Sequence, residues 1–219
     1  MHEITKKEFK ISKTDITFEK IYSKDYFPND VPGIREANML LIPNENLRDN
    51  TGYTFPETTD EFYEFLQERA DADFKPDIAI SDDAFKKFIM HSAEVPLATI
   101  ICKDVVVPIV ITLISSFLYD LASSYLRKQE DLSAEINLII EEEHGKSIKL
   151  NYRGPVSEVK ETLNNVVLKV FGDKFSLEKD GQVIVMKNVK AINSNQTIQS
   201  EREDDESYDN NGNKEISSD

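Results

Sequence analysis

Alternating and continuous apolar runs in the first hundred residues predict a set of short strands. Apolar and polar positions alternate over Phe9–Ile21, with Ile16 and Phe18 in the second half, which is typical of one or two half-buried strands. Asn38–Pro43 and Pro76–Ile80 are short apolar runs bounded by turn residues, and each predicts a strand. Leu97–Cys102 is another such run, of strand or helix type.

Two helices are predicted among these strands. Thr58 followed by Glu61 is the pattern of a helix N-cap, and apolar residues then recur at helical spacing up to Leu66. Ser81 or Asp82 is placed to cap a second helix. The inward-facing residues of that helix are predicted to be Phe85, Phe88 and Ile89.

The longest apolar segment, Val105–Leu126, predicts one long helix. Pro108 suits its first turn, fifteen uncharged residues run from Val105 to Tyr119, and Arg127-Lys128 closes it. Its polar residues recur at helical spacing along one side: Thr112, Ser115, Ser116, Tyr119, Asp120 and Ser123. A membrane span needs about 20 predominantly apolar residues, and Asp120 interrupts the run. Three interpretations remain open: a core helix of a soluble protein, a membrane-inserting segment or a homo-oligomerisation helix.

The region after residue 130 has the pattern of two hairpins around one helix. The helix is predicted to begin after a cap at Ser157 and to end at Gly172, and Asp180-Gly181 predicts the turn of the second hairpin. The four predicted strands cover residues 134–143, 146–152, 174–178 and 182–189. This order is a ββαββ unit, and we expect the two hairpins to share one sheet beneath the helix.

Taken together, these patterns predict an α+β protein. It consists of an N-terminal α/β half, a long hydrophobic helix, a C-terminal ββαββ unit and a disordered acidic tail. The corresponding regions are 1–104, 105–128, 131–192 and 193–219.

Charge is the first compositional feature that restricts the function. The chain has 26 basic and 41 acidic side chains, a net charge of −15, so direct nucleic-acid binding is not expected. Ser200–Asp219 holds eight acidic and two basic residues and few apolar ones, which predicts disorder. Residues 1–24 carry a small positive excess but no apolar stretch of a secretory signal. We therefore expect a cytoplasmic protein, with membrane association through Val105–Leu126 as the alternative.

The sequence contains few candidates for catalytic residues. Cys102 is the single cysteine and stands in an apolar run, which favours a buried structural thiol over a nucleophile. Neither a Gly-x-Ser-x-Gly elbow nor a glycine-rich phosphate loop occurs. Asp77, Asp82 and Asp83 are weak candidates for a Mg²⁺ or Ca²⁺ site. No cofactor is expected, and a metal-dependent hydrolase is the third hypothesis for function.

The leading hypothesis is a non-enzymatic interaction or regulatory component that acts through a protein partner or a second copy of the chain. An accessory protein of a bacterial or phage conflict system is one such role. A membrane-associated effector that inserts or oligomerises through residues 105–126 is the runner-up. The candidate contact residues are Phe62, Tyr63, Phe65, Thr112, Ser116, Tyr119 and Asp120.

Overall fold

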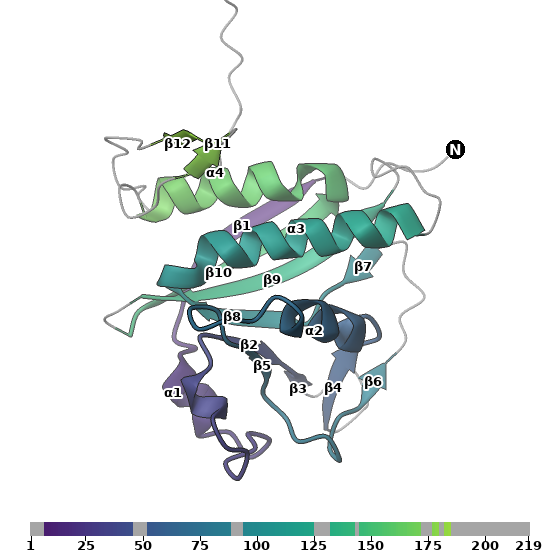
Figure 1. Cartoon of the computed structure of the whole chain (residues 1–219), viewed down its shortest axis with the longest axis vertical. Helices are drawn as coiled ribbons and strands as arrows, with labels where there is room; N and C mark the ends of the chain where they lie inside the picture. Colours follow the sequence, from purple (N-terminus) through teal and green to yellow (C-terminus); the bar gives the residue numbers. More distant parts are fainter. Residues whose placement is uncertain are drawn as a thin grey trace, which may run out of the picture.

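The fold is α+β, as the sequence predicted: a mixed sheet carries helices on both of its faces (Figure 1). The computed structural model describes residues 7–45, 52–88, 94–124, 132–142, 145–171, 177–179 and 182–184. All statements below concern these residues, and for 171, 177–179 and 182–184 only the backbone is described.

The main sheet has the strand order β1-β10-β9-β8-β2-β5, and β7 lies beside β9 as a seventh described strand. Its strands are β1 (Glu8–Thr14), β2 (Met39–Ile42), β5 (Pro76–Ile78), β7 (Glu94–Pro96), β8 (Thr99–Lys103), β9 (Ser133–Glu141) and β10 (Ser147–Pro155). The β1/β10, β10/β9 and β8/β2 pairs are antiparallel, whereas β8/β9, β7/β9 and β2/β5 are parallel. Strands from the two ends of the chain therefore meet in one sheet.

Two smaller sheets complete the described strands. One joins β3 (Asn44–Glu45), β4 (Tyr53–Pro56) and β6 (Lys87–Phe88), and the other pairs β11 (Leu177–Lys179) with β12 (Gln182–Ile184).

The parallel strand pairs explain where the long apolar helix lies. Parallel neighbours cannot be joined by a tight hairpin, so a connection must cross over the sheet. The connection from β8 to β9 contains the 3₁₀ turn Asp104–Val106 and α3 (Val107–Ser124), and the one from β2 to β5 contains α2 (Thr59–Gln67). The predicted helix at Val105–Leu126 is thus a crossover helix with one side on the sheet.

Both faces of the central strands are buried. α2, α3 and α4 (Val159–Phe171), the last preceded by the 3₁₀ turn Val156–Glu158, cover one face and enclose the larger core (Figure 1). On the other face, α1 (Phe18–Tyr22) and the 3₁₀ turn Ile34–Glu36 pack over a second core. Strands buried on both faces read as continuous apolar runs, which is the pattern of Met39–Ile42.

Most of the predicted elements are confirmed. The strands within 38–43, 76–80 and 97–102 are β2, β5 and β8, and the helix after Thr58 is α2. The 134–152 hairpin is β9–β10, the helix after Ser157 is α4, and β11 and β12 form the second hairpin. Pro108 is the second residue of α3, within the first turn as expected.

The prediction of a strand through Ile16 and Phe18 was wrong, because α1 begins at Phe18. The Thr17 side chain accepts a hydrogen bond from the Lys20 amide at 3.3 Å, and Glu19 lies in the first turn. This N-cap starts a helix where the apolar alternation alone predicted a strand.

The predicted helix after Ser81 or Asp82 was also wrong. The chain makes a turn, in which the Ala84 amide donates to the Ser81 carbonyl at 3.0 Å, and then enters β6. A hydrogen bond with the Ser81 side chain lowers the pKa of Asp83, so these short polar side chains hold a turn instead. Phe85 stacks on Phe55 with ring centroids 5.1 Å apart. Ile89 lies outside the described residues.

The expectation that both C-terminal hairpins share one sheet was wrong for the described strands. β11 and β12 pair with each other, while the place beside β10 is taken by β1 over seven residue pairs, from Glu8–Arg153 to Thr14–Ser147. The predictions that lie outside the described residues are the helix closure at 127–128, the helix end at Gly172, the turn at 180–181 and the tail at 193–219.

Candidate interaction surface

One side of α3 is left uncovered by the rest of the described structure. Val110, Ile114, Phe117, Leu118 and Leu121 turn inward to the core. The opposite side, which we call the outer strip, consists of Val105 from the preceding turn and Ile109, Thr112, Ser116, Tyr119, Asp120 and Ser123. The predicted contact residues Thr112, Ser116, Tyr119 and Asp120 therefore do share one exposed side of the helix.

Large hydrophobic side chains are concentrated on this strip. Four of them are exposed in the described part of the chain: Val105 (72%), Tyr119 (54%), Ile109 (40%) and Val31 (40%). Three of the four belong to the strip. Sequence reasoning did not select Val105 and Ile109, although their spacing before Thr112 places them on the side of the helix that carries the polar residues.

Several hydroxyl groups of α3, including those of Thr112 and Ser123 on the outer strip, donate hydrogen bonds to their own helix. Thr112 Oγ1 donates to the Pro108 carbonyl at 2.9 Å, and Ser123 Oγ donates to the Tyr119 carbonyl at 2.9 Å. Ser115 Oγ does the same toward Ile111 at 2.8 Å. Because their protons are engaged in this way, these hydroxyls offer lone pairs, and hence acceptors, to whatever approaches the strip.

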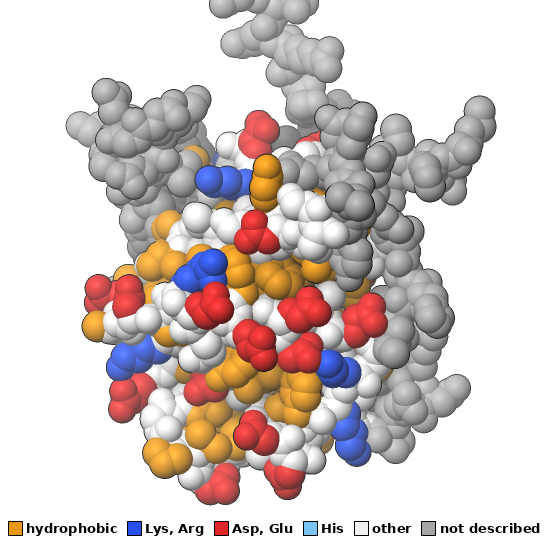
Figure 2. All heavy atoms as spheres, turned by 45° about the vertical axis from the view of Figure 1, so that its right-hand side comes forward, with side chains coloured by type: hydrophobic (Ala, Val, Ile, Leu, Met, Phe, Trp, Pro, Cys, Tyr) orange, Lys and Arg blue, Asp and Glu red, His pale blue; other side chains and the backbone are white. Residues whose placement is uncertain are grey.

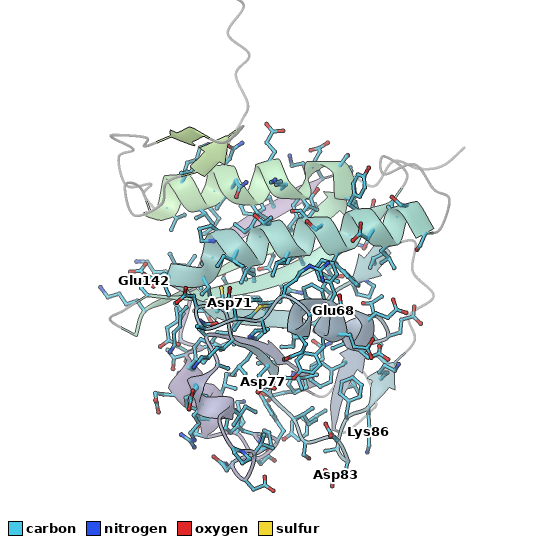
Figure 3. All side chains as sticks on the ribbon, in the orientation of Figure 1. Glu68, Asp71, Asp77, Asp83, Lys86 and Glu142 are labelled. Atoms are coloured by element: carbon cyan, nitrogen blue, oxygen red, sulfur yellow. The ribbon has the colours of Figure 1, made fainter. Side chains whose placement is uncertain are left out.

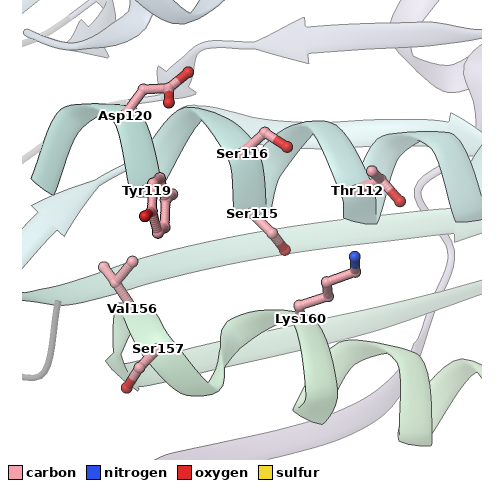
Figure 4. A pocket seen from close by; sticks show the side chains of 8 residues that line it. All are labelled: Thr112, Ser115, Ser116, Tyr119, Asp120, Val156, Ser157 and Lys160. Carbon is pink, nitrogen blue, oxygen red and sulfur yellow. The ribbon is translucent and has the colours of Figure 1, made fainter. Parts of the chain in front are cut away.

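A groove of about 320 Å³ lies between α3 and the start of α4 (Figure 4). Lys160 extends from α4 toward α3, and Tyr119 points from α3 toward Val156. Asp120 points the opposite way, away from α4. The groove is lined by Thr112, Ser115, Ser116, Tyr119, Asp120, Val156, Ser157 and Lys160.

A second groove, of about 340 Å³, lies between α2 and α3, and we call it the acidic groove. Phe65, Phe117 and Leu121 supply its apolar lining. Its remaining lining residues are Glu61, Glu64, Glu68, Asp120 and Ser124. On the face that includes the right-hand side of Figure 1, acidic side chains are interspersed with hydrophobic patches (Figure 2).

The three predicted aromatic contact residues of α2 have separate environments. Phe62 is fully buried, with its ring centroid 4.9 Å from that of Phe117. The Tyr63 hydroxyl donates to Asp77 Oδ1 at 3.1 Å, and burial together with this carboxylate raises the tyrosine pKa. Phe65 is half-buried and 5.5 Å from Phe117. Of these three residues, Phe65 lines a groove. Phe62 and Tyr63 instead connect α2 to the rest of the fold, through Phe117 and Asp77.

The weak metal candidates are not assembled into a ligand set. Asp77 Oδ1 accepts hydrogen bonds from Tyr63 and from the Ile78 amide at 2.8 Å, and Asp83 lies apart from it (Figure 3). Among the described residues, no group of three or more His, Cys, Asp or Glu side chains is placed to hold a metal ion. Cys102 is fully buried, and burial raises the pKa of its thiol, which opposes thiolate formation.

In the described part of the chain, one helical stretch, Asp104–Ser124, is long and apolar enough to cross a membrane, with a mean hydropathy of 2.1. Half of this stretch is buried inside the protein. Such a helix is compatible with a soluble core or with membrane association. Comparison with known protein families, curated proteins and solved structures gives no match for this chain. Function is therefore argued from the surfaces described above.

Proposed function

We propose that this chain is a non-enzymatic interaction component that binds a protein partner through the outer strip of α3. The observation that carries the proposal is the placement along one strip of Val105, Ile109 and Tyr119, three of the four large hydrophobic side chains that are exposed among the described residues. Exposed apolar groups within a polar surround are characteristic of contact surfaces, and Tyr is among the residues enriched there.

The composition of the strip favours a protein over a lipid surface. Asp120 lies beside Tyr119 inside the apolar stretch Asp104–Ser124, and a charge placed in the hydrocarbon layer of a bilayer is unfavourable. The chain carries a net charge of −15, which anionic lipids repel. Inserting α3 would also require its inner side to leave the sheet, where Ile114 and Leu118 are fully buried. These points support a cytoplasmic location.

The same charge disfavours a second copy as the partner. In a two-fold symmetric contact both copies use the same surface, so the carboxylates beside the strip of one copy would face the same acidic surface on the other. Like charges facing each other across an interface cost free energy. A partner with a different, less acidic surface avoids this cost.

The test compares Ile109→Asp with Val31→Asp. Both positions are 40% exposed, and both changes add one negative charge, but only Ile109 belongs to the strip. The chain and its variants are purified by affinity from the native host under mild conditions. We expect one co-purifying protein to be retained by the parent and by Val31→Asp and to be lost from Ile109→Asp. Equal retention by both variants would contradict the proposal.

A further inference from the structure

We infer that the acidic groove between α2 and α3 receives a basic amphipathic segment of the partner, with apolar side chains between the helices and lysine or arginine side chains at the rim. This inference rests on the proposed function and specifies the chemistry of the partner. It concerns a surface next to the outer strip, because Asp120 belongs to both.

The apolar lining of the groove is what an apolar side chain of the partner would contact. Phe65 is half-buried, whereas Phe117 and Leu121 retain only 6% and 8% exposure. The Phe65 and Phe117 rings contact each other edge to face at 5.5 Å and so form the aromatic wall where the two helices meet. A volume of about 340 Å³ accommodates side chains but not a whole helix, so the partner is expected to lie across the opening.

The rim supplies the charge selectivity. Glu61, Glu64 and Glu68 follow each other at spacings of three and four residues and therefore share one face of α2. Asp120 lies opposite them, on α3. Of the described residues that line the groove, four carry carboxylates and none is basic. Because like charges are excluded and opposite charges attracted, this rim selects a cationic segment.

The chain already binds one of its own cations in the way proposed for the partner. The Arg69 guanidinium lies over the Phe65 ring, 3.6 Å from its centroid, and Arg69 Nη1 lies 3.1 Å from Glu68 Oε2. A single basic group is thus held by an aromatic face and a carboxylate together. Phe65 and Glu68 both line the groove, so the same two groups border the site that a partner's basic residues would approach.

The probe is a synthetic peptide of about 18 residues, made of leucine and lysine in a helical amphipathic pattern. Its binding to the full chain is measured by fluorescence anisotropy. Two comparison peptides show which properties binding requires. One has glutamate in place of lysine and tests the charge, and the other has the same composition without the amphipathic order and tests the pattern. We expect only the first, ordered cationic peptide to bind with a measurable Kd.

A matched pair of variants separates the groove from the overall acidity. The groove variant is Glu61→Gln/Glu64→Gln/Asp120→Asn, and the control is Glu19→Gln/Asp30→Asn/Glu161→Gln, whose three residues are exposed and do not line the groove. Both variants remove the same three charges. We expect about a tenfold weaker Kd for the groove variant and less than about a twofold change for the control.

Equal losses in the two variants, or no loss in either, would overturn the inference, because binding would then follow net charge or another surface. The variant Arg127→Gln/Lys128→Gln tests whether these two basic residues of the chain itself compete with the peptide for the groove. If they do, the peptide binds this variant more tightly than the parent, and the groove is then assigned to the chain's own basic residues and not to a partner. If no peptide binds but Ile109→Asp still loses its partner, the proposed function stands and this inference fails.

Discussion

The ring centroid of Phe117 in α3 lies 4.9 Å from that of Phe62 in α2, and the two rings are tilted by 47°. This contact ties the crossover helix of β2–β5 to the crossover helix of β8–β9. It also fixes the base of the acidic groove, because Phe117 lines it while Phe62 is fully buried behind it.

Phe117→Ala is expected to lower the free energy of unfolding by about 3–5 kcal/mol, because it removes a buried ring and leaves a cavity between the two helices. Tyr119→Ala is the control, since it truncates an aromatic side chain on the exposed side of the same helix. Its effect should stay within about 0.5 kcal/mol. Urea denaturation followed by circular dichroism measures both, and similar losses would contradict the described orientation of α3.

Gly154→Ala tests the close packing at the β1–β10 edge. A Cβ at this position would lie 3.1 Å from the Tyr152 hydroxyl and 3.3 Å from the Lys7 Cα. Tyr152 is only 1% exposed and its hydroxyl donates to the Pro155 carbonyl at 2.6 Å, so it has little room to move. We expect a loss of about 1–3 kcal/mol in denaturant unfolding. Unchanged stability would show that the backbone at Lys7, just before β1, does not pass this close to Gly154.

The Asp60–Lys87 ion pair links α2 to β6 and gives a pH prediction. Burial raises the pKa of the Asp60 carboxyl, but the hydrogen bond from Lys87 and backbone amides outweigh it, so the pKa is lowered below its ordinary value of 3.8. A carboxyl with a lowered folded-state pKa stabilises the fold above its ordinary pKa and loses that contribution as pH falls through the lowered value.

Acid titration of thermal stability checks this pair. Between about pH 4 and 2 the parent should lose stability more steeply than Asp60→Asn, which has no carboxyl to protonate there. Lys87→Met should reduce the same slope, because it removes the group that lowers the pKa. The effect is small, since both side chains are more than 40% exposed. Identical slopes in all three proteins would indicate that the pair does not form in solution.

The α+β class and most elements followed from the sequence because their signals are local. Periodicity located α2, α3 and α4, and Pro108 marked the first turn of α3 correctly. The pairing of β1 with β10 could not be predicted, since it joins residues about 140 positions apart and depends on which edge is free after the crossovers are in place. Local polar contacts also determine the conformation of the two segments for which apolar periodicity predicted the wrong element. Thr17 caps α1, and Ser81 and Asp83 hold a turn.

The candidate surface was predicted in part. The polar side of α3 was visible as the spacing from Thr112 to Asp120, but a helical pattern alone does not reveal which residues a neighbouring helix covers. The exposure of Val105 and Ile109 and the convergence of α2 carboxylates on Asp120 arise only when α2, α3 and α4 are placed on the sheet.

Cell fractionation tests the location that we propose. The chain should remain in the soluble fraction, because its apolar helix has half of its length buried against the protein and its net charge repels anionic lipids. Recovery in a membrane pellet that resists high salt and requires detergent for release would favour the membrane-associated alternative through Val105–Leu126.

The most direct test of the central claim is photo-crosslinking in intact host cells. A photoreactive amino acid is placed at Ile109 in one sample and at Val31 in another, two positions with the same exposed fraction in different parts of the fold. The proposal that the outer strip of α3 binds a protein partner predicts a discrete protein adduct from position 109 and none of that mass from position 31. Adducts to lipid, to a second copy of the chain, or no adduct from position 109 would contradict it.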